Sequence, residues 1–292
     1  MTGRRAGAAG SGARNEGVDV MRRGSGDDRL PPWWVEVLVG VVAYVAYQLV
    51  QVLVTGSARA AVTRALDLWS WERTFHLDPE IPLNQLLSGH HELVVVAGLY
   101  YSMLHFLVTP SVLVWLRLRR RHVYASLRNT LVGASLVALL VFWLLPMAPP
   151  RLSVPGIIDT LKVDQILSAG TPSWPGSLAN QYAAMPSLHV AWSVWVALAL
   201  AVAIGRGPGR YLVWAYPLST TLVVIATGNH FLVDAVAGTS LVAGTWYVIR
   251  RGPRTGQLEP GQAEAGECSC TPVPDAVVDS RASLAGEGPS GR

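Results

Sequence analysis

The sequence predicts an all-α integral membrane protein with six transmembrane helices, and three features favour this fold class. Charged residues make up 14% of the 292-residue chain and hydrophobic residues 51%, whereas soluble domains carry roughly 25% charged residues. Eleven Trp and nine Tyr stand against four Phe, which favours rings with a polar atom, the kind that collect at membrane–water boundaries. Several apolar stretches approach the roughly 20 residues that a helix needs to cross the hydrocarbon. A disordered chain is therefore excluded, and an ordinary cytosolic enzyme is disfavoured.

Six apolar stretches fill the middle of the chain, and Glu36 and Asp234 are the only charged residues within them. Because the lipid interior cannot satisfy free backbone amides, each stretch is expected to be helical throughout. The stretches are residues 34–54, 93–116, 129–148, 188–205, 211–229 and 230–249.

The two ends of the chain differ in composition from the membrane domain, residues 31–251. Residues 1–30 and 252–292 are rich in Gly, Ala, Pro and charged residues and have no apolar run, so both are expected to be disordered tails and the first is not a signal peptide. The only cysteines, Cys268 and Cys270, lie in the second tail and exclude a disulfide framework or a cysteine metal cage. The net charge of +4 comes from arginines that flank the apolar stretches. It therefore does not indicate a nucleic-acid partner, and none is expected.

The placement of Lys and Arg predicts that both termini are cytoplasmic. Most basic residues, including the cluster at 117–121, then lie inside. The outer side holds five basic residues: Arg59, Arg64, Arg73, Arg151 and Lys162. Two long loops lie outside, residues 55–92 and 149–186. The first contains SARAAVTRALDLWSWERTF, whose apolar residues recur near helical spacing, so it is either a helix in the membrane interface or an ordinary surface helix.

Ionisable groups in or beside membrane helices are costly and are therefore candidates for function. In TGNHFLVDAVAG, His230 and Asp234 are four residues apart, which on a helix places both side chains on one face. The carboxylate can then hold one imidazole nitrogen and leave the other free as a nucleophile or base.

Two further segments are expected at the same outer boundary. In AAMPSLHVAW, Pro186 suits the first turn of a helix, and Ser187 and His189 share that turn. The free N–H groups of such a turn attract phosphate. Arg151 of PMAPPRL follows the third stretch and supplies the side chain best shaped to clamp phosphate oxygens. Together, these segments predict a site for phosphoryl transfer on the extracytoplasmic side.

Arg, then PSLH, then HxxxD, in this order on a six-span chain, resembles the type-2 phosphatidic acid phosphatase superfamily of lipid phosphatases and phosphotransferases. Within the superfamily, the chain is most similar to the inositol phosphorylceramide synthase-like branch, also called inositol phosphotransferase-like. The segments that carry this similarity are NQYAAMPSLH and TGNHFLVDAVAG. The resemblance covers roughly residues 71–249. It implies a metal-independent enzyme without a cofactor, which acts on a lipid phosphate at the outer leaflet of the cell membrane.

The resemblance also implies a role for each motif residue. His230 is the nucleophile that forms a phosphohistidine, and Asp234 orients it. His189 is the general acid for the leaving oxygen and then the base for water or an acceptor alcohol. The implied ligands of the phosphate oxygens are Arg151, Ser187, the amides near Leu188, and Asn229.

The chain departs from the superfamily pattern where two cationic phosphate ligands are usual. Leu144 replaces a Lys seven residues before Arg151, and Val223 and Val224 replace a Ser-Arg pair. The usual PSGH reads PSLH, as in the inositol-phosphotransferase-like branch. The polar residues that could fill the gap are Lys162, Asn180, Gln181, Tyr182 and Asn229.

The remaining ionisable residues have plainer interpretations. His105 in YYSMLHFLVTP is expected to form a hydrogen bond between helices, and His76, His90 and His91 to be solvated. The loop residues Asp159 and Asp164 are expected on the surface.

Four functions remain open at this point. The leading one is a lipid phosphatase or phosphotransferase, and the second is a transferase of phosphoinositol-type head groups between lipids. A non-catalytic lipid transporter or flippase is an alternative of another class, as is a haem protein with His189 and His230 as axial ligands.

Overall fold

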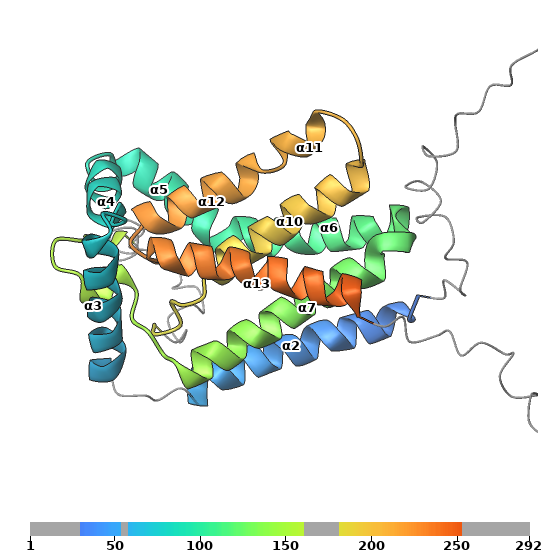
Figure 1. The fold of residues 1–292 in the computed structure, drawn as a ribbon, viewed down its shortest axis with the longest axis horizontal. Coiled ribbons are helices and arrows are strands. Elements are labelled where there is room, and N and C mark those ends of the chain that lie inside the picture. The colour runs from blue at the N-terminus through green and yellow to red at the C-terminus, as the bar shows by residue number, and fades with distance from the viewer. Residues whose placement is uncertain (1–29, 54–57, 161–180, 253–292) are drawn as a thin grey trace, which may run out of the picture. The chain divides into compact units, whose positions relative to one another are not determined.

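The structure is a computed structural model that describes residues 30–53, 58–160 and 181–252. The regular elements in these ranges are helices (Figure 1), so the all-α prediction is confirmed. They are α2 (Trp33–Leu53), α3 (Ala58–Thr74), α4 (Glu80–Ser88), α5 (His91–Leu99), the π-helical turn η1 (Tyr100–Leu104), α6 (His105–Arg119), α7 (Arg121–Leu144), α8 (Pro150–Ser153), α10 (Leu188–Ile204), α11 (Gly209–Leu212), α12 (Ala215–Ala226) and α13 (Leu232–Arg251). Apart from Leu30 and Gly252, the two expected tails lie outside the described residues.

Four helical segments of the described chain are long and apolar enough to cross a membrane. They are Trp33–Val50, the continuous run of α5, η1 and α6 over His91–Arg119, Arg121–Leu144 and Leu232–Arg251. The apolar helix Leu188–Ile204 is shorter. The chain is therefore a multi-pass membrane protein.

Helix α7 and the pair of α11 and α12 differ from the apolar segments expected at 129–148 and 211–229. Helix α7 begins at Arg121, eight residues before the expected start at Asn129, and so includes the charged Arg128. The stretch 211–229 is not one helix, because α11 ends at Leu212 and α12 begins at Ala215. Pro217 explains this break, since proline has no N–H to donate to the carbonyl of residue 213.

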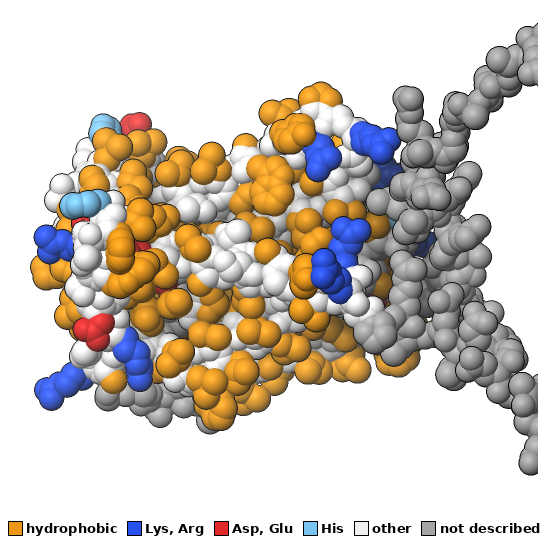
Figure 2. Space-filling model, viewed as in Figure 1, with side chains coloured by type: hydrophobic (Ala, Val, Ile, Leu, Met, Phe, Trp, Pro, Cys, Tyr) orange, Lys and Arg blue, Asp and Glu red, His pale blue; other side chains and the backbone are white. Residues whose placement is uncertain are grey.

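Hydrophobic side chains cover the middle of the helical bundle in the view of Figure 2, whereas Lys and Arg side chains lie at both of its ends, including the end where α13 finishes. Acidic and histidine side chains appear at the opposite end, over α3 and α4. Large side chains such as Leu107 and Val248 are about two-thirds exposed. Such a wide apolar surface is typical of a protein whose surroundings are lipid.

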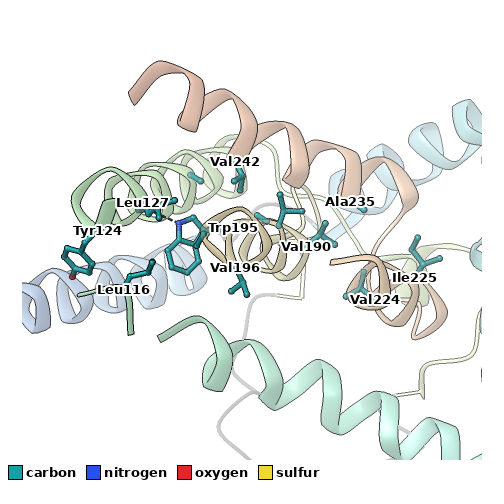
Figure 3. Close-up of a cluster of buried hydrophobic side chains, with 14 residues drawn as sticks. Leu116, Tyr124, Leu127, Val190, Trp195, Val196, Val224, Ile225, Ala235 and Val242 are labelled. Atoms are coloured by element: carbon teal, nitrogen blue, oxygen red, sulfur yellow. Dashed lines mark hydrogen bonds between the residues drawn. The ribbon is translucent and has the colours of Figure 1, made fainter. Parts of the chain in front are cut away.

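Helix α10 lies at the centre of the bundle and packs against α6, α7, α12 and α13. Its Trp195 is fully buried (Figure 3), and the indole N–H donates to the Leu127 carbonyl oxygen at 2.8 Å. Val190, Val194 and Val196 on the same helix belong to this core. Burial on nearly every side explains why α10 is apolar all round.

A buried ionic contact joins α2 to the bundle at the end where α13 finishes. The Glu36 Oε1 atom accepts hydrogen bonds from Arg117 of α6 at 3.3 Å and from Arg128 of α7 at 2.7 Å. The single charge of the first apolar stretch is therefore paired rather than left in lipid.

Helices α3 and α4 cover the opposite end of the bundle, and we call residues 58–88 the α3–α4 cap (Figure 1). The expected helix in the 55–92 loop is present as α3. Ala61 and Ala65 are fully buried in a cluster with Ala148 and Phe231. The Ala148 N–H donates to the Ala61 carbonyl oxygen at 3.2 Å. One face of α3 therefore packs on the protein itself.

Two glutamates of the α3–α4 cap accept hydrogen bonds from the first turn of α13. Glu80 Oε1 accepts from the Leu232 N–H at 2.9 Å, and Glu72 Oε1 accepts from the Val233 N–H at 2.8 Å. Both side chains are 0% exposed. Burial raises the pKa of Glu72 to about 8 and that of Glu80 to about 6, although the N–H groups oppose this shift.

Gly238 sets the distance between α13 and the start of α10. A Cβ atom at this position would lie 2.4 Å from the Ser187 carbonyl oxygen. We therefore expect Gly238→Ala to push the helices apart and to lower the free energy of unfolding by about 1–3 kcal/mol. Thermal unfolding in detergent measures this loss. Gly244→Ala on the same helix meets nothing within 4 Å and is the control, so equal stability of the two variants would contradict the packing argument.

The raised pKa of Glu72 makes stability depend on pH. An unfolded glutamic acid loses its proton near 4.5, whereas folded Glu72 keeps it up to about 8. The folded state therefore binds more protons in this window, and its stability falls as pH rises from about 4.5 through about 8. Glu72→Gln cannot ionise and keeps an acceptor for the Val233 N–H, so its melting temperature should fall less over this range. The exposed Asp67→Asn on α3 should keep the wild-type slope, and a wild-type slope in Glu72→Gln would refute the shift.

Candidate active site

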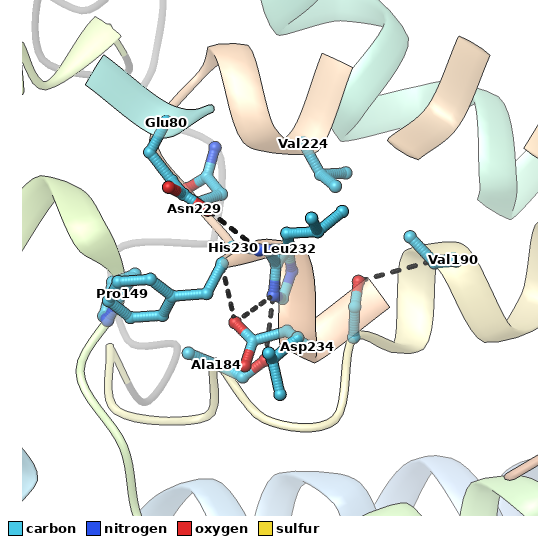
Figure 4. Close-up of polar contacts among 12 residues, drawn as sticks. Glu80, Pro149, Ala184, Val190, Val224, Asn229, His230, Leu232 and Asp234 are labelled. Atoms are coloured by element: carbon cyan, nitrogen blue, oxygen red, sulfur yellow. Dashed lines mark hydrogen bonds and ion pairs between the residues drawn. The ribbon is translucent and has the colours of Figure 1, made fainter. Parts of the chain in front are cut away.

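Three chain segments far apart in the sequence meet beneath the α3–α4 cap: the segment after α7, the segment leading into α10, and the turn between α12 and α13 (Figure 4). Backbone hydrogen bonds join them. The Ala184 N–H donates to the Met147 carbonyl oxygen at 3.2 Å, the Arg151 N–H to that of Gly228 at 2.9 Å, and the Ser187 N–H to that of Asp234 at 3.0 Å. The structure thus brings the three sequence motifs into one place.

The His230 imidazole is buried and held through one of its two nitrogens. Nδ1 lies 2.8 Å from the Ala184 carbonyl oxygen and 3.5 Å from Asp234 Oδ2 (Figure 4). Because a carbonyl oxygen can only accept, Nδ1 carries the hydrogen and donates it. Nε2 is then left with a lone pair, which is the form that a nucleophile needs.

Asp234 lies beside one imidazole nitrogen of His230, but not through the shared helical face that the sequence argument assumed. His230 lies before α13, which begins at Leu232, so the two residues do not share a helical face. Asp234 is the third residue of the helix, and its Oδ2 turns back to accept the Phe231 N–H at 2.8 Å. The closer acceptor for the imidazole is the Ala184 carbonyl oxygen, while the carboxylate lies near enough to attract a positive charge on the ring.

His189 lies in the first turn of α10, inside a group of rings. Its centroid is 5.8 Å from that of His230 and 4.1 Å from that of Tyr101, which stacks on it at 20°. His105 meets it edge-on at 4.3 Å. The expected hydrogen bond of His105 between helices is not found, because its Nδ1 has no partner among the described residues. Tyr101 and His105 are four apart in the sequence, and that spacing could have indicated a shared face toward His189.

The start of α10 differs slightly from the expected one. Ser187 is the N-cap residue, and its buried Oγ accepts the Val190 N–H at 3.4 Å. Pro186 precedes the cap and is not in the first turn. Within the described ranges, no acceptor meets the N–H groups of Leu188 and His189. Two amide donors at a helix start are suited to binding an anion.

Arg151 is oriented by two side chains. Its Nε donates to Asn229 Oδ1 at 2.9 Å, and its Nη1 lies 3.2 Å from Asp159 Oδ2. The prediction that Asp159 is a surface residue was wrong, since its side chain is 12% exposed and paired. Asn229 Nδ2 donates to Thr227 Oγ1 at 2.8 Å. Asn229 therefore holds Arg151 in this arrangement and uses both ends of its amide.

Asn84 and Gly228 shape the loop that carries Arg151. Asn84 is fully buried in α4. Its Nδ2 donates to the carbonyl oxygens of Ile158 at 3.1 Å and Ala226 at 2.9 Å, and its Oδ1 accepts the Ile158 N–H. Gly228 has φ +69°, and a Cβ there would lie 2.8 Å from Ile157 Cγ2, so only glycine fits this turn. The sequence analysis did not identify these two residues.

Apolar residues occupy the positions where the superfamily usually has cations. Leu144 is 57% exposed on the bundle surface, and Val224 is buried in the core. Of the residues considered as replacements, Gln181 is exposed and Tyr182 is half-buried. Lys162 and Asn180 lie outside the described ranges, as does Asp164. His76, His90 and His91 are exposed, as expected.

The arrangement suits attack by nitrogen on phosphorus. It combines an imidazole with a free nitrogen, a second imidazole, a guanidinium and an open helix start. In the part of the chain that the structure describes, no group of three or more His, Cys, Asp or Glu is placed to hold a metal ion.

Comparison with known proteins gives one match. Residues 66–248 match the family model of the PAP2 superfamily, and this range contains each of the three motifs and both cap glutamates. No curated protein and no solved structure matches the chain. Because the family model covers more than half of its length, this chain belongs to the PAP2 superfamily of membrane phosphatases and phosphotransferases.

Proposed function

We propose that this protein is a metal-independent membrane enzyme that cleaves a lipid phosphoester through a phosphohistidine on His230. The observation that carries the proposal is the hydrogen bond from His230 Nδ1 to the Ala184 carbonyl oxygen, which leaves Nε2 unprotonated. His189 and the open start of α10 lie beside it.

The first step forms a bond between His230 Nε2 and phosphorus and breaks the bond from phosphorus to the leaving oxygen. Protonated His189 donates its proton to that oxygen. Arg151 and the amides of Leu188 and His189 hold the remaining phosphate oxygens as negative charge shifts among them. The phosphorylated His230 ring is positive, and the Asp234 carboxylate stabilises this charge from 3.5 Å.

The second step reverses the first with a new acceptor. Neutral His189 takes a proton from water or an alcohol, whose oxygen bonds to phosphorus as the bond from phosphorus to Nε2 breaks. His230 returns to its neutral form and His189 is protonated again. Water as acceptor makes the enzyme a phosphatase, and an alcohol makes it a transferase.

We also propose that the chain spans the membrane six times, with both termini cytoplasmic and the site at the outer leaflet. Beyond the four long helices, α10 and the pair of α11 and α12 supply the other two spans. The basic clusters support this orientation, because Arg250 and Arg251 end α13 whereas His230 precedes its start.

A transferase of phosphoinositol-type head groups, as in the inositol phosphorylceramide synthase-like branch, is the alternative within this mechanism. Leu188 in PSLH favours it, because this branch resembles the chain at that position. Leu144 and Val224 favour it as well, because they replace the Lys and Arg that usually bind a free phosphate monoester, and Val223 replaces the accompanying Ser. Release of inorganic phosphate from a lipid monoester supports the phosphatase. Transfer of a labelled head group to an added lipid alcohol supports the transferase.

Trapping of labelled phosphate tests the nucleophile. Wild-type protein incubated with a ³²P-labelled lipid phosphate and quenched in alkali should carry label on His230, whereas His230→Ala should carry none. His189→Ala should lose turnover by about 10²–10⁴-fold, the usual effect of a general acid–base group. Label that survives His230→Ala would overturn the mechanism, and lipid movement that survives His230→Ala without any turnover would indicate a transporter instead.

Substitution of Arg151 tests phosphate binding. Arg151→Ala removes the guanidinium and should lower kcat/KM by about 100-fold or more, because a charged hydrogen-bond donor to the transition state is lost. Arg151→Lys keeps the charge but not the paired contacts with Asn229 and Asp159, so it should recover only part of the activity. The exposed Arg73→Ala in the cap is the control and should match the wild type. Unchanged kinetics in Arg151→Ala would remove Arg151 from the site.

A further inference from the structure

The start of α13 has its backbone donors occupied by carboxylates. The N–H groups of Phe231, Leu232 and Val233 donate to Asp234, Glu80 and Glu72, respectively, at 2.8–2.9 Å. These three donors follow His230 directly in the chain. Two of the three acceptors come from the α3–α4 cap, some 150 residues away in the sequence.

The burial of Glu72 and Glu80 costs free energy, because each side chain keeps one oxygen without a partner in the described ranges. Each side chain is fully buried, and each Oε2 has no hydrogen-bond partner among the described residues. A buried carboxyl oxygen without a partner destabilises a fold. A serine or threonine N-cap could accept a hydrogen bond at a helix start with a smaller free-energy cost. This indicates that the two carboxyl groups have a role besides stabilising the fold.

Their contacts fix the segment that carries the nucleophile. The His230 N–H donates to the Val224 carbonyl oxygen at 3.2 Å, and its ring donates to that of Ala184. Glu80 and Glu72 hold the next turn from the other side. His230 is thereby held between the α12 end, the segment before α10 and the α3–α4 cap.

The same contacts distinguish the two helix starts at the site. The first turn of α13 faces carboxyl groups, whereas Leu188 and His189 at the start of α10 meet no acceptor in the described ranges. An incoming phosphate therefore finds the N–H groups of Phe231, Leu232 and Val233 occupied at α13 and those of Leu188 and His189 free at α10. This difference favours a phosphorus position in front of His230 over one at the start of α13.

Helix α4 connects this support to the phosphate-binding side. Asn84 lies one helical turn after Glu80, is also fully buried, and holds the backbone of Ile158. Asp159, the next residue, pairs with Arg151. One face of α4 therefore supports both the nucleophile segment and the arginine loop.

We propose that Glu72 and Glu80 are positioning residues that hold His230 in line with a phosphate bound at the start of α10. This inference rests on the proposed function, because it assigns the two glutamates a part in that reaction. They act through the Leu232 and Val233 N–H groups and do not touch the substrate.

Steady-state kinetics of the full chain in liposomes separate positioning from stability. Glu72→Gln and Glu80→Gln keep an acceptor oxygen and should retain kcat to within about threefold, whereas Glu72→Leu and Glu80→Leu should lower kcat by about 100-fold, the effect of a misplacement near 1 Å. KM should change by less than about threefold, since the phosphate ligands remain. Leucine variants with wild-type kcat, or glutamine variants as impaired as the leucine ones, would overturn the proposal.

Glu36 provides the matched control at the opposite end of the bundle. It is also a largely buried glutamate, but its partners are Arg117 and Arg128. Glu36→Gln and Glu36→Leu should lower the melting temperature while folded protein keeps its kcat. If the cap variants behave in the same way as the Glu36 variants, the cap glutamates are only structural.

A measurement that needs no turnover distinguishes this inference from the proposed reaction. Diethyl pyrocarbonate modifies neutral imidazole, and peptide mass spectrometry reports its rate at His230 alone. The buried His230 should react severalfold faster in the leucine variants than in the wild type and glutamine variants. A faster rate in a protein without phosphoester activity would retain the positioning role and refute the reaction, whereas an unchanged rate overturns the positioning role. If a leucine variant does not insert, Glu80→Asp or Glu72→Asp withdraws the acceptor by one methylene and should give the same acceleration.

Discussion

The close approach of α10 and α13 is the contact on which the candidate site depends. Gly238 has no side chain, so the Ser187 carbonyl oxygen can lie against the α13 backbone, and the Ser187 N–H donates to the Asp234 carbonyl oxygen. This arrangement places His189, in the first turn of α10, beside His230, which directly precedes the N-cap residue of α13. A side chain at position 238 would push the two helix starts, and with them these imidazoles, apart.

Polar groups at this end of the bundle are satisfied mainly by one another. The backbone segments before α10 and after α7 pair through Met147 and Ala184, and side-chain amides and carboxylates complete the network at Asn84, Asn229 and Asp159. A membrane-embedded site has little water to compensate for a missing partner. The network is therefore extensive and joins segments that are far apart in the sequence.

The helical class and the three motifs could be predicted from the sequence because both depend on local patterns. Long apolar stretches indicate membrane helices, and the spacing in PSLH and HxxxD is visible without a structure. The break before α12 could also have been expected from Pro217. The start of α13 was misplaced, because a helix pattern does not show that His230 stands outside it.

The supporting residues were missed for a different physical reason. Glu72 lies in a helix that also carries exposed charges, such as Arg73 and Asp67, so nothing local distinguishes it as buried. Its partner, the Val233 N–H, is 161 residues away. Asp159 was assigned to the surface because its loop is rich in polar residues and glycine, and its pairing with Arg151 arises only when the loop folds over Gly228. Contacts over such separations leave no periodic signal.

The central position of α10 has a consequence for its length. Its 17 residues extend about 26 Å, which is less than the roughly 30 Å of hydrocarbon, and it packs against α6, α7, α12 and α13. Because these neighbours separate most of α10 from lipid, its own length need not match the thickness of the bilayer. A bilayer of another thickness acts first on the outer helices, which can tilt to fit it.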